Sequence, residues 1–264
     1  MCTFPTSVSQ SRHTYDLTVV IPAFNEALRI VEPLRRVDRY LRDSSISGEI
    51  IVVDDGSSDD TVERIRGIVP ALSVPVTIIP SPLNKGKGHA VKTGVMRARG
   101  RAVLMTDADL STPIEELEKL LPQLSNGVQI AIGSRKMPGA VIAVRQPLLR
   151  EAMGRVFTML VNVLVVRASD VTCGFKVFTR DAAVTIFSRV TIDDWSFDAE
   201  VLYIARRLGF RVREVPVRWH DVAGTKVRRG LDAVRSLRGI AHILWNGVRG
   251  RYSRGPEPAP RENA

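Results

Sequence analysis

The chain has 264 residues, 44% of them hydrophobic and 25% charged, and its formal net charge is +10. This length and composition predict a globular protein with a substantial core, built as one α/β domain or one domain with an appendage. Two cysteines far apart in sequence, Cys2 and Cys173, indicate neither a disulfide framework nor a zinc site, and a reduced, cytosolic setting fits best. No apolar run reaches the ~18 residues of a spanning helix, and residues 1–15 lack the apolar core of a signal peptide.

Strand and helix patterns alternate from residue 16 to about residue 135. Short runs of β-branched and apolar residues predict the strands, and apolar residues at helical spacing predict the helices. Strands are expected at 16–21, 49–53, 74–79, 101–105 and 128–132, with helices from about 26 to 42, at 60–68, at 89–99 and at 114–124. This alternation predicts an α/β fold with a largely parallel sheet covered on both faces.

The second half of the chain is less regular. We expect irregular structure at 137–146, a helix at 148–166, a turn and short strand at 170–178, a helix through residue 208 and a strand at 210–219. A last helix, 226–252, follows the main domain of residues 16–225 and is basic and amphipathic. Residues 1–15 and 253–264 are polar and are expected to be disordered.

Two carboxylates, Asp107 and Asp109, follow the predicted strand 101–105 directly. Ligands of open α/β sheets collect at the carboxyl ends of strands. Two acidic groups held there repel each other unless a cation lies between them, and a hard divalent cation with oxygen ligands is the usual solution. The alternative is structural: Asp109 caps the next helix, and Asp107 is solvated.

The ends of two neighbouring strands carry further polar residues. Residues 22–26 read Pro-Ala-Phe-Asn-Glu, and residues 53–57 read Val-Asp-Asp-Gly-Ser. A carboxylate at a strand end can accept hydrogen bonds from a nucleobase or a ribose hydroxyl, and Gly56 allows a flat base to approach the backbone. Together with the Asp107 pair, these motifs predict a nucleotide-diphosphate site at one sheet edge.

Residues 84–88, Asn-Lys-Gly-Lys-Gly, lie between a predicted strand and a predicted helix. Such a loop can cradle phosphate groups, although it matches neither the P-loop nor the dinucleotide-binding pattern. Close packing at the start of the helix remains the alternative.

These motifs, with Asp-Ala-Asp-Leu-Ser-Thr at 107–112 and Gly-Ser-Arg at 133–135, resemble the family 2 glycosyltransferases of the GT-A fold. Residues 172–176, Thr-Cys-Gly-Phe-Lys, and residues 195–203 narrow the resemblance to the dolichyl- and polyprenyl-phosphate sugar synthases, closest to the dolichyl-phosphate β-glucosyltransferase branch. The resemblance runs from about residue 16 to residue 230, with the motifs in order.

The resemblance implies roles for individual residues. Asp107 and Asp109 are implied to hold Mg²⁺ or Mn²⁺, which bridges to the donor diphosphate. The positions implied to bind the nucleotide sugar are Pro22, Ala23, Phe24, Glu26, Val53, Asp54, Asp55, Lys87, Asp107, Ala108, Asp109, Ser111, Arg135 and Lys226. Mannose-type relatives carry Arg six residues before the lysine that corresponds to Lys226, where this chain has His220. The implied donor is therefore UDP-glucose or a UDP-N-acetylhexosamine such as UDP-GalNAc.

The implied reaction is inverting transfer of the sugar to polyprenyl phosphate. A phosphate monoester has its second pKa near ~6, so this acceptor is largely dianionic at neutral pH and needs little help from a base. Asp198 is the first candidate for a catalytic base and Asp170 the second. For both residues the alternative is capping, since Asp198 precedes a helix and Asp170 a turn.

The C-terminal part carries half of the excess positive charge. Residues 221–264 contain nine Lys and Arg against four Asp and Glu, a balance of +5. An amphipathic helix with an Arg face and Trp245 near its end can lie in a layer of lipid headgroups. We therefore expect a cytoplasmic protein, peripheral on the inner face of the membrane and active in cell-wall glycan synthesis. A homo-oligomer or a membrane-protein partner stays open, as does a core-packing role for the helix.

Two other functions remain open from the sequence. The same donor could serve a glycan, protein or small-molecule acceptor. A non-enzymatic, basic nucleic-acid-binding protein is the more remote alternative. Aromatic residues make up only 6% of the chain and the acidic pairs would repel a nucleic-acid backbone, so nucleic acid is not an expected partner.

Overall fold

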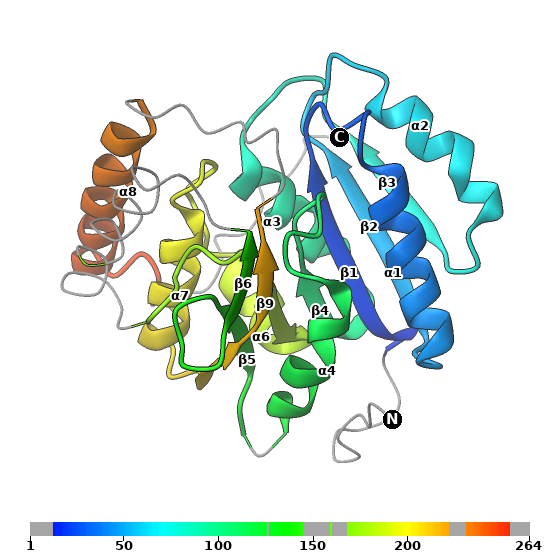
Figure 1. Ribbon diagram of the computed structural model, residues 1–264. Helices are drawn as coiled ribbons and strands as arrows, with labels where there is room; N and C mark the ends of the chain where they lie inside the picture. Colours follow the sequence, from blue (N-terminus) through cyan, green and yellow to red (C-terminus); the bar gives the residue numbers. More distant parts are fainter. Residues whose placement is uncertain (1–12, 126, 145–158, 160–167, 222–230, 254–264) are drawn as a thin grey trace, which may run out of the picture.

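The computed structural model describes residues 13–125, 127–144, 159, 168–221 and 231–253. Its centre is a seven-stranded sheet in the order β3-β2-β1-β4-β7-β5-β8 (Figure 1). The strands are β1 (Tyr15–Ala23), β2 (Gly48–Asp54), β3 (Val76–Pro80), β4 (Gly100–Met105), β5 (Ile130–Ser134), β7 (Lys176–Thr179) and β8 (Val212–Pro216). Neighbours pair in parallel except for β7, which runs antiparallel to both β4 and β5. The mostly parallel mixed sheet is confirmed.

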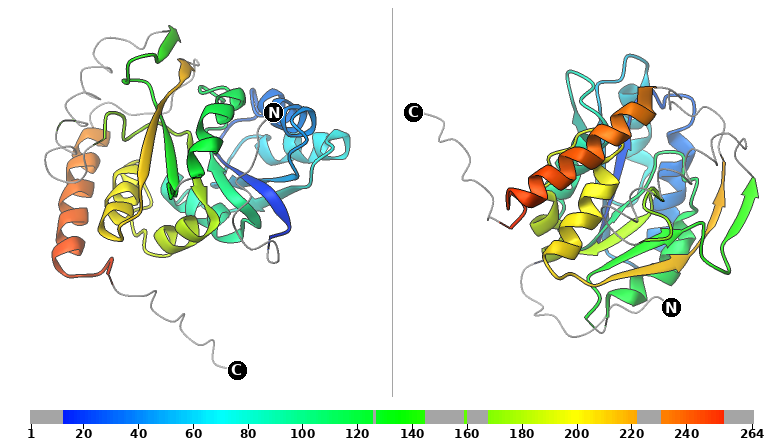
Figure 2. Two further views of the ribbon diagram at one scale, coloured as in Figure 1. Left: turned by 90° about the horizontal axis from the view of Figure 1, so that it is seen from below. Right: turned by 90° about the vertical axis from the view of Figure 1, so that its left-hand side faces the viewer.

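Helices cover both faces of this sheet (Figures 1 and 2). One face carries α3 (Lys87–Arg97), α6 (Arg180–Phe187), α7 (Phe197–Arg207) and α8 (Leu231–Val248). The other face carries α1 (Val31–Asp43), α2 (Thr61–Ile68) and α4 (Leu117–Leu120), with the 3-10 turns η1 (Val69–Ala71), η2 (Ile114–Glu116) and η3 (Leu121–Leu124).

Two hydrophobic clusters fill the space between the sheet and these helices. Successive side chains of a strand point to opposite faces. Val20 of β1 and Ile51 of β2 accordingly belong to the cluster under α3, whereas Val19 and Ile50 belong to the cluster under α1. Strands buried on both faces are expected to be almost continuously apolar, and β1, β2 and β4 have this composition.

A second sheet of two parallel strands joins β6 (Val141–Val144) to β9 (Arg218–His220) and lies at the front of the view in Figure 1. The predicted strand 210–219 is therefore two strands in two sheets. The change of sheet falls at Val217, whose amide donates to the Ser134 carbonyl of β5 and whose carbonyl accepts from the Val141 amide of β6. The irregular structure expected at 137–146 is wrong for β6, and the helix α6 was not predicted.

Several helix boundaries also differ from expectation. The helix expected at 114–124 is one α-helical turn between two 3-10 turns, because Pro122 interrupts the helical hydrogen bonds. α1 begins at Val31, later than expected, after turns in which Arg29 and Ile30 donate to the carbonyl of Glu26. The helix expected at 148–166 lies outside the described residues except for Met159. The disordered tails expected at 1–15 and 253–264 lie outside them except for residues 13–15 and 253, and Tyr15 already belongs to β1. Among the described helices, none combines the length and the apolar character that a bilayer crossing requires.

Candidate functional site

The carboxyl ends of β1, β2 and β4 meet at one edge of the sheet. Ala23 pairs with Asp54 across β1 and β2, and Val20 pairs with Met105 across β1 and β4. The Asp55 amide donates to the carbonyl of Ala23 at 2.8 Å, which continues this pairing beyond the strands. The predicted meeting of residues 22–26, 53–55 and 107–109 at one edge is therefore what the fold produces.

The loop after β1 is held in place by the loop after β2. Asn25 has φ 52°, a left-handed conformation that Asn tolerates better than most residues. Its amide donates to Ser57 Oγ at 2.8 Å, and its Oδ1 accepts from the Ser58 amide at 2.8 Å. Glu26 is buried, donates through its amide to Thr61 Oγ1 at 2.7 Å and forms an ion pair with Arg29. Phe24 directly precedes these anchored residues in the chain.

The two carboxylates after β2 have different surroundings. Both oxygens of Asp55 accept hydrogen bonds from the glycine-rich loop, from the Lys85 amide at 2.9 Å and from the Gly86 amide at 2.8 Å. Asp54 Oδ2 accepts from the Ser57 amide at 3.2 Å, whereas Asp54 Oδ1 is buried without a hydrogen-bond partner among the described residues. An unpaired buried acceptor is costly, so a hydrogen-bond donor from a ligand would stabilise this strand end.

The glycine-rich loop 84–88 contains a lysine that pairs with the first of the two carboxylates. Lys87 Nζ lies 2.5 Å from Asp107 Oδ1, and the ammonium also lies 5.0 Å from the ring centroid of Trp195. Gly86 has φ +111°, and a Cβ on it would lie 2.3 Å from the carbonyl oxygen of Asp193. The close packing that the sequence left open for this loop is therefore present; whether the loop also binds phosphate remains a prediction.

The electrostatics of Asp107 combine burial with three nearby cations. Burial acts to raise the pKa of its carboxyl, but Lys87, and then Lys176 and Arg135, more than offset this effect and lower the pKa. Its side chain is still 37% exposed, so a ligand can reach it. Gly174 explains how Asp107 fits, because a Cβ there would lie 2.2 Å from Asp107 Oδ2.

Asp109 is oriented by its own loop. Its Oδ1 accepts from the Ser111 amide at 3.0 Å, and its Oδ2 lies 4.0 Å from Arg29 Nη1. Leu110 between them has φ 47°, and Ala108 is buried in the core. Asp109 thus makes a local cap-like contact and still keeps a 20% exposed side chain at the sheet edge.

The far side of the site is built from buried ion pairs. Arg135 forks onto the fully buried Asp170, with Nε 2.6 Å from Oδ2 and Nη2 2.8 Å from Oδ1, and also bonds Thr172 Oγ1 at 3.0 Å. Burial acts to raise the pKa of Asp170, but hydrogen bonding and charge from Arg135 dominate and lower it. Asp198 is likewise buried and pairs with the ammonium of Lys176. Both base candidates are thus bonded to cations.

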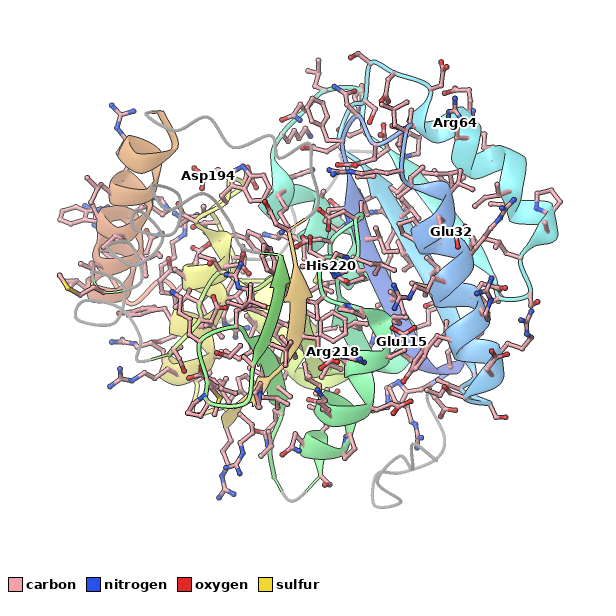
Figure 3. The ribbon with its side chains drawn as sticks, viewed as in Figure 1. Glu32, Arg64, Glu115, Asp194, Arg218 and His220 are labelled. Atoms are coloured by element: carbon pink, nitrogen blue, oxygen red, sulfur yellow. The ribbon has the colours of Figure 1, made fainter. Side chains whose placement is uncertain are left out.

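Ser111 and His220 connect the site to the small sheet. His220, labelled in Figure 3, lies at the end of β9, and its amide donates to the carbonyl of Ser111 at 3.0 Å. Pro22, Ala23 and Val53 are strand residues at the same edge. Lys226, the last predicted site residue, lies outside the described residues.

Sequence reasoning missed three residues of the site. Lys176 is fully buried and bonds the Cys173 carbonyl and Asp198, and Arg29 links Glu26 to Asp109. Gly174 accommodates Asp107. The sequence offered one signal for Lys176, a charged residue in an otherwise apolar strand. A lysine in a buried strand indicates a partner, because buried charges are nearly always paired.

The oxygen-rich end of β4 suits a hard cation, but the protein supplies only part of a coordination shell. Among the described residues there is no group of three His, Cys, Asp or Glu side chains that could hold a metal ion. Mg²⁺ commonly binds through one or two carboxylates together with substrate phosphates and water. Asp107 and Asp109 fit that arrangement.

A mixed, mainly parallel sheet with carboxylates at adjoining strand ends is the GT-A arrangement of nucleotide-sugar transferases. Residues 18–187 match the family model described as glycosyl transferase family 2. The chain belongs to glycosyl transferase family 2 and is a glycosyltransferase. Family membership removes the non-enzymatic alternative.

Curated relatives match most of the chain. A dolichyl-phosphate beta-glucosyltransferase of Trichomonas vaginalis is 40% identical over 238 residues, which are 85% of this chain and 69% of the relative. The human protein of the same name is 35% identical over 227 residues, covering 81% of this chain and 70% of the relative. Among solved structures, glucosyl-3-phosphoglycerate synthase from Mycobacterium tuberculosis in complex with Mn²⁺ and UDP-glucose has a TM-score of 0.62 at 19% identity, covering 93% of this chain and 81% of that one. This last similarity concerns the fold.

Proposed function

We propose that the chain transfers glucose from UDP-glucose to a polyprenyl phosphate, of which dolichyl phosphate is one example, with inversion at the anomeric carbon. The observation that carries the proposal is the group formed by Asp107 and Asp109, which follow β4, and Lys87, which begins α3 and pairs with Asp107. Its substrates are inferred from relatives at 32–40% identity, which are named dolichyl-phosphate beta-glucosyltransferases.

The donor nucleotide is assigned to the edge formed by β1 and β2. Residues 22–26 and Asp54 line this edge, and the unpaired Asp54 Oδ1 leaves an acceptor for a ligand donor. The diphosphate is assigned to the next strand end, where Lys87 supplies a positive charge. The sugar is assigned to the surroundings of Ala108, Ser111 and Arg135, as the resemblance implied. UDP-N-acetylhexosamine stays the alternative donor.

In the proposed site, Asp107 and Asp109 would hold Mg²⁺ or Mn²⁺. When bound, the ion supplies positive charge that stabilises the departing UDP. The ion pair with Lys87 offsets the negative charge of Asp107. The pair thereby reduces the repulsion between Asp107 and Asp109 at the sheet edge.

The acceptor provides its own nucleophile. A dianionic phosphate oxygen attacks the anomeric carbon while the bond from that carbon to the UDP oxygen breaks, which gives a β-linked product from an α-linked donor. Asp198 and Asp170 are buried in ion pairs with Lys176 and Arg135. These contacts support positioning roles for both carboxylates rather than proton transfer, and the chemistry of a phosphate acceptor requires no base.

The lipid part of the acceptor is assigned to a membrane surface next to α8. Leu237, Trp245 and Val248 are exposed apolar residues on this helix, and the Arg249 guanidinium lies 4.4 Å from the Trp245 ring centroid. An aromatic ring beside a cation suits the headgroup layer of a membrane. We therefore propose peripheral binding at the cytoplasmic face.

Purified protein assayed with a panel of UDP-glucose, UDP-GalNAc, UDP-GlcNAc and GDP-mannose tests this proposal, with a polyprenyl phosphate as acceptor and Mn²⁺ present. We expect a β-glucosyl polyprenyl phosphate from UDP-glucose alone. A different preferred sugar would correct the donor. Transfer to a glycan, protein or small molecule but not to polyprenyl phosphate would contradict the acceptor.

A further inference from the structure

A buried carboxylate outside the proposed site holds the segment that lies beside it. Glu200 of α7 is fully buried and accepts four hydrogen bonds. The donors are the Thr191 amide at 2.9 Å, Thr191 Oγ1 at 2.6 Å, the Ile192 amide at 2.8 Å and Tyr252 Oη at 2.7 Å. We call residues 191–196 the bridging segment, because one side of it contacts α8 and the other contacts the glycine-rich loop.

The α8 side of the bridging segment is a continuous polar network. His242 Nε2 lies 3.0 Å from Thr191 Oγ1 and 2.8 Å from Asn246 Nδ2, which also lies 3.3 Å from Tyr252 Oη. Gly239 allows a close approach, since a Cβ there would lie 2.5 Å from Ser196 Cβ. α7 and α8 are neighbours in the fold (Figure 2).

The other side of the bridging segment supports the glycine-rich loop. The Gly88 amide donates to the carbonyl of Asp193 at 2.7 Å, and the His89 amide contacts the same oxygen at 3.3 Å. A Cβ on Gly88 would lie 2.5 Å from the Ile192 carbonyl oxygen. Figure 3 labels Asp194 within this segment, between α8 and the centre of the molecule.

The glycine-rich loop in turn carries the charges of the proposed donor site. Its Lys85 and Gly86 amides bond Asp55, and Lys87 bonds Asp107 and lies against Trp195 of the bridging segment. If the bridging segment shifts, the contacts that hold Lys87 shift with it. The Lys87 ammonium then changes its position next to Asp107.

We propose that Glu200 is a positioning residue that sets the glycine-rich loop for donor binding and couples the seating of α8 to the donor site. This inference rests on the proposed function, which places UDP beside Lys87 and α8 at the membrane. The coupling follows from two sets of contacts that share one carboxylate. Energetic coupling is reciprocal, so a change in α8 alters the affinity for UDP.

Variants at Glu200 separate positioning from simple stability. Glu200→Met keeps the length of the side chain but leaves the Thr191 and Ile192 amides without their acceptor. Glu200→Gln restores an acceptor oxygen for these amides, and its NH₂ group donates to the two hydroxyls, which can rotate to accept. We expect the dissociation constant for UDP with Mn²⁺, measured by calorimetry, to rise about tenfold in Glu200→Met and to stay within about threefold of the wild type in Glu200→Gln.

Leu117→Ala is the matched control, because Leu117 is fully buried in the core of the opposite sheet face. It is expected to lower Tm as a core truncation does while leaving UDP affinity unchanged. Tyr252→Phe removes the α8-side bond to Glu200 together with the contact between Tyr252 Oη and Asn246, and we expect it to weaken UDP binding by about threefold. If Glu200→Met does not fold, Tyr252→Phe still tests the coupling.

The outcomes are distinct. UDP binding by the wild type is measured first, and its absence would overturn the proposed function together with this inference. If the wild type binds UDP, a lowered Tm with unchanged UDP affinity in both Glu200→Met and Tyr252→Phe assigns Glu200 a purely structural role and overturns the coupling alone.

Discussion

Lys87 Nζ lies 2.5 Å from Asp107 Oδ1, so the first carboxylate after β4 has a cationic partner supplied by the protein itself. A divalent ion that binds Asp107 must share this carboxylate with the ammonium or displace it. The pair therefore lies at the centre of the proposed donor site, and its electrostatics determine how the site responds to pH.

Replacing Lys87 changes the pH at which Asp107 becomes protonated. Burial favours the neutral carboxyl, and Lys87 is the main group that lowers the pKa against this effect. In Lys87→Met the pKa of Asp107 rises, so transfer is lost at a higher pH on acidification than in the wild type. The acid limb of kcat/KM against pH measures this shift. Lys92→Met is the control, since Lys92 lies on the same helix but bonds the Val190 carbonyl, and coincident acid limbs in Lys87→Met and wild type would contradict the account.

A substitution at Gly174 tests whether transfer activity depends on the position of the Asp107 carboxylate. A Cβ at Gly174 would lie 2.2 Å from Asp107 Oδ2, so Gly174→Ala forces the carboxylate away from its position near Lys87. We expect transfer to fall by about a hundredfold with only a modest change in Tm. Gly67→Ala is the matched control: a Cβ there meets nothing within 4 Å, and Ala is favoured over Gly in a helix by about 1 kcal/mol. Equal activity of the two variants would be evidence against this placement.

The ion pair between Arg135 and Asp170 predicts a pH-dependent contribution to stability. Asp170 is fully buried and its pKa is lowered, so the contribution is present above the ordinary Asp pKa of about 3.9 and is lost as the pH falls through the lowered value. Asp170→Asn should reduce the free energy of unfolding by about 3 kcal/mol at neutral pH. Urea unfolding from neutral pH to about pH 2 should show the gap to the wild type closing in acid. A gap that is constant across this range would show that the charge of Asp170 is not what stabilises the site.

Substitutions on the exposed face of α8 test membrane binding without disturbing the core. Trp245 and Leu237 are exposed, whereas Ile240 and Ile243 of the same helix are buried against the domain. Trp245→Ser with Leu237→Ser should reduce sedimentation with anionic vesicles by about tenfold and leave Tm unchanged, because only lipid-facing apolar area is removed. Undiminished sedimentation would remove α8 as the membrane contact.

The sequence predicted the sheet and the edge at which its polar strand ends meet, for a physical reason. β1, β2 and β4 are buried on both faces, so their apolar runs are unmistakable, and parallel strands with helices between them must bring their polar ends to one edge. Asp54 ends β2 and Asp107 and Asp109 follow β4, so their meeting at one edge follows from the topology.

What the sequence did not reveal depends on pairing across long separations. The division of the predicted strand 210–219 between two sheets depends on Ser134 and Val141, which lie far away in the chain. Asp198 pairs with Lys176, and Asp170 pairs with Arg135. No local sequence pattern indicates that these carboxylates already have cationic partners. The role of Glu200 likewise follows only once Thr191 and Tyr252 are seen around it.

The most direct test of the central claim is UDP binding measured by calorimetry with Mn²⁺ and again with EDTA, for the wild type and for Asp109→Asn. The amide of Asn can keep the hydrogen bond that Asp109 accepts from Ser111, so the fold should survive while the charge is lost. We predict that EDTA weakens UDP binding to the wild type by about a hundredfold, and that Asp109→Asn binds weakly in both conditions and does not transfer glucose. UDP binding by the wild type that is indifferent to EDTA would contradict the assignment of a divalent cation to Asp107 and Asp109.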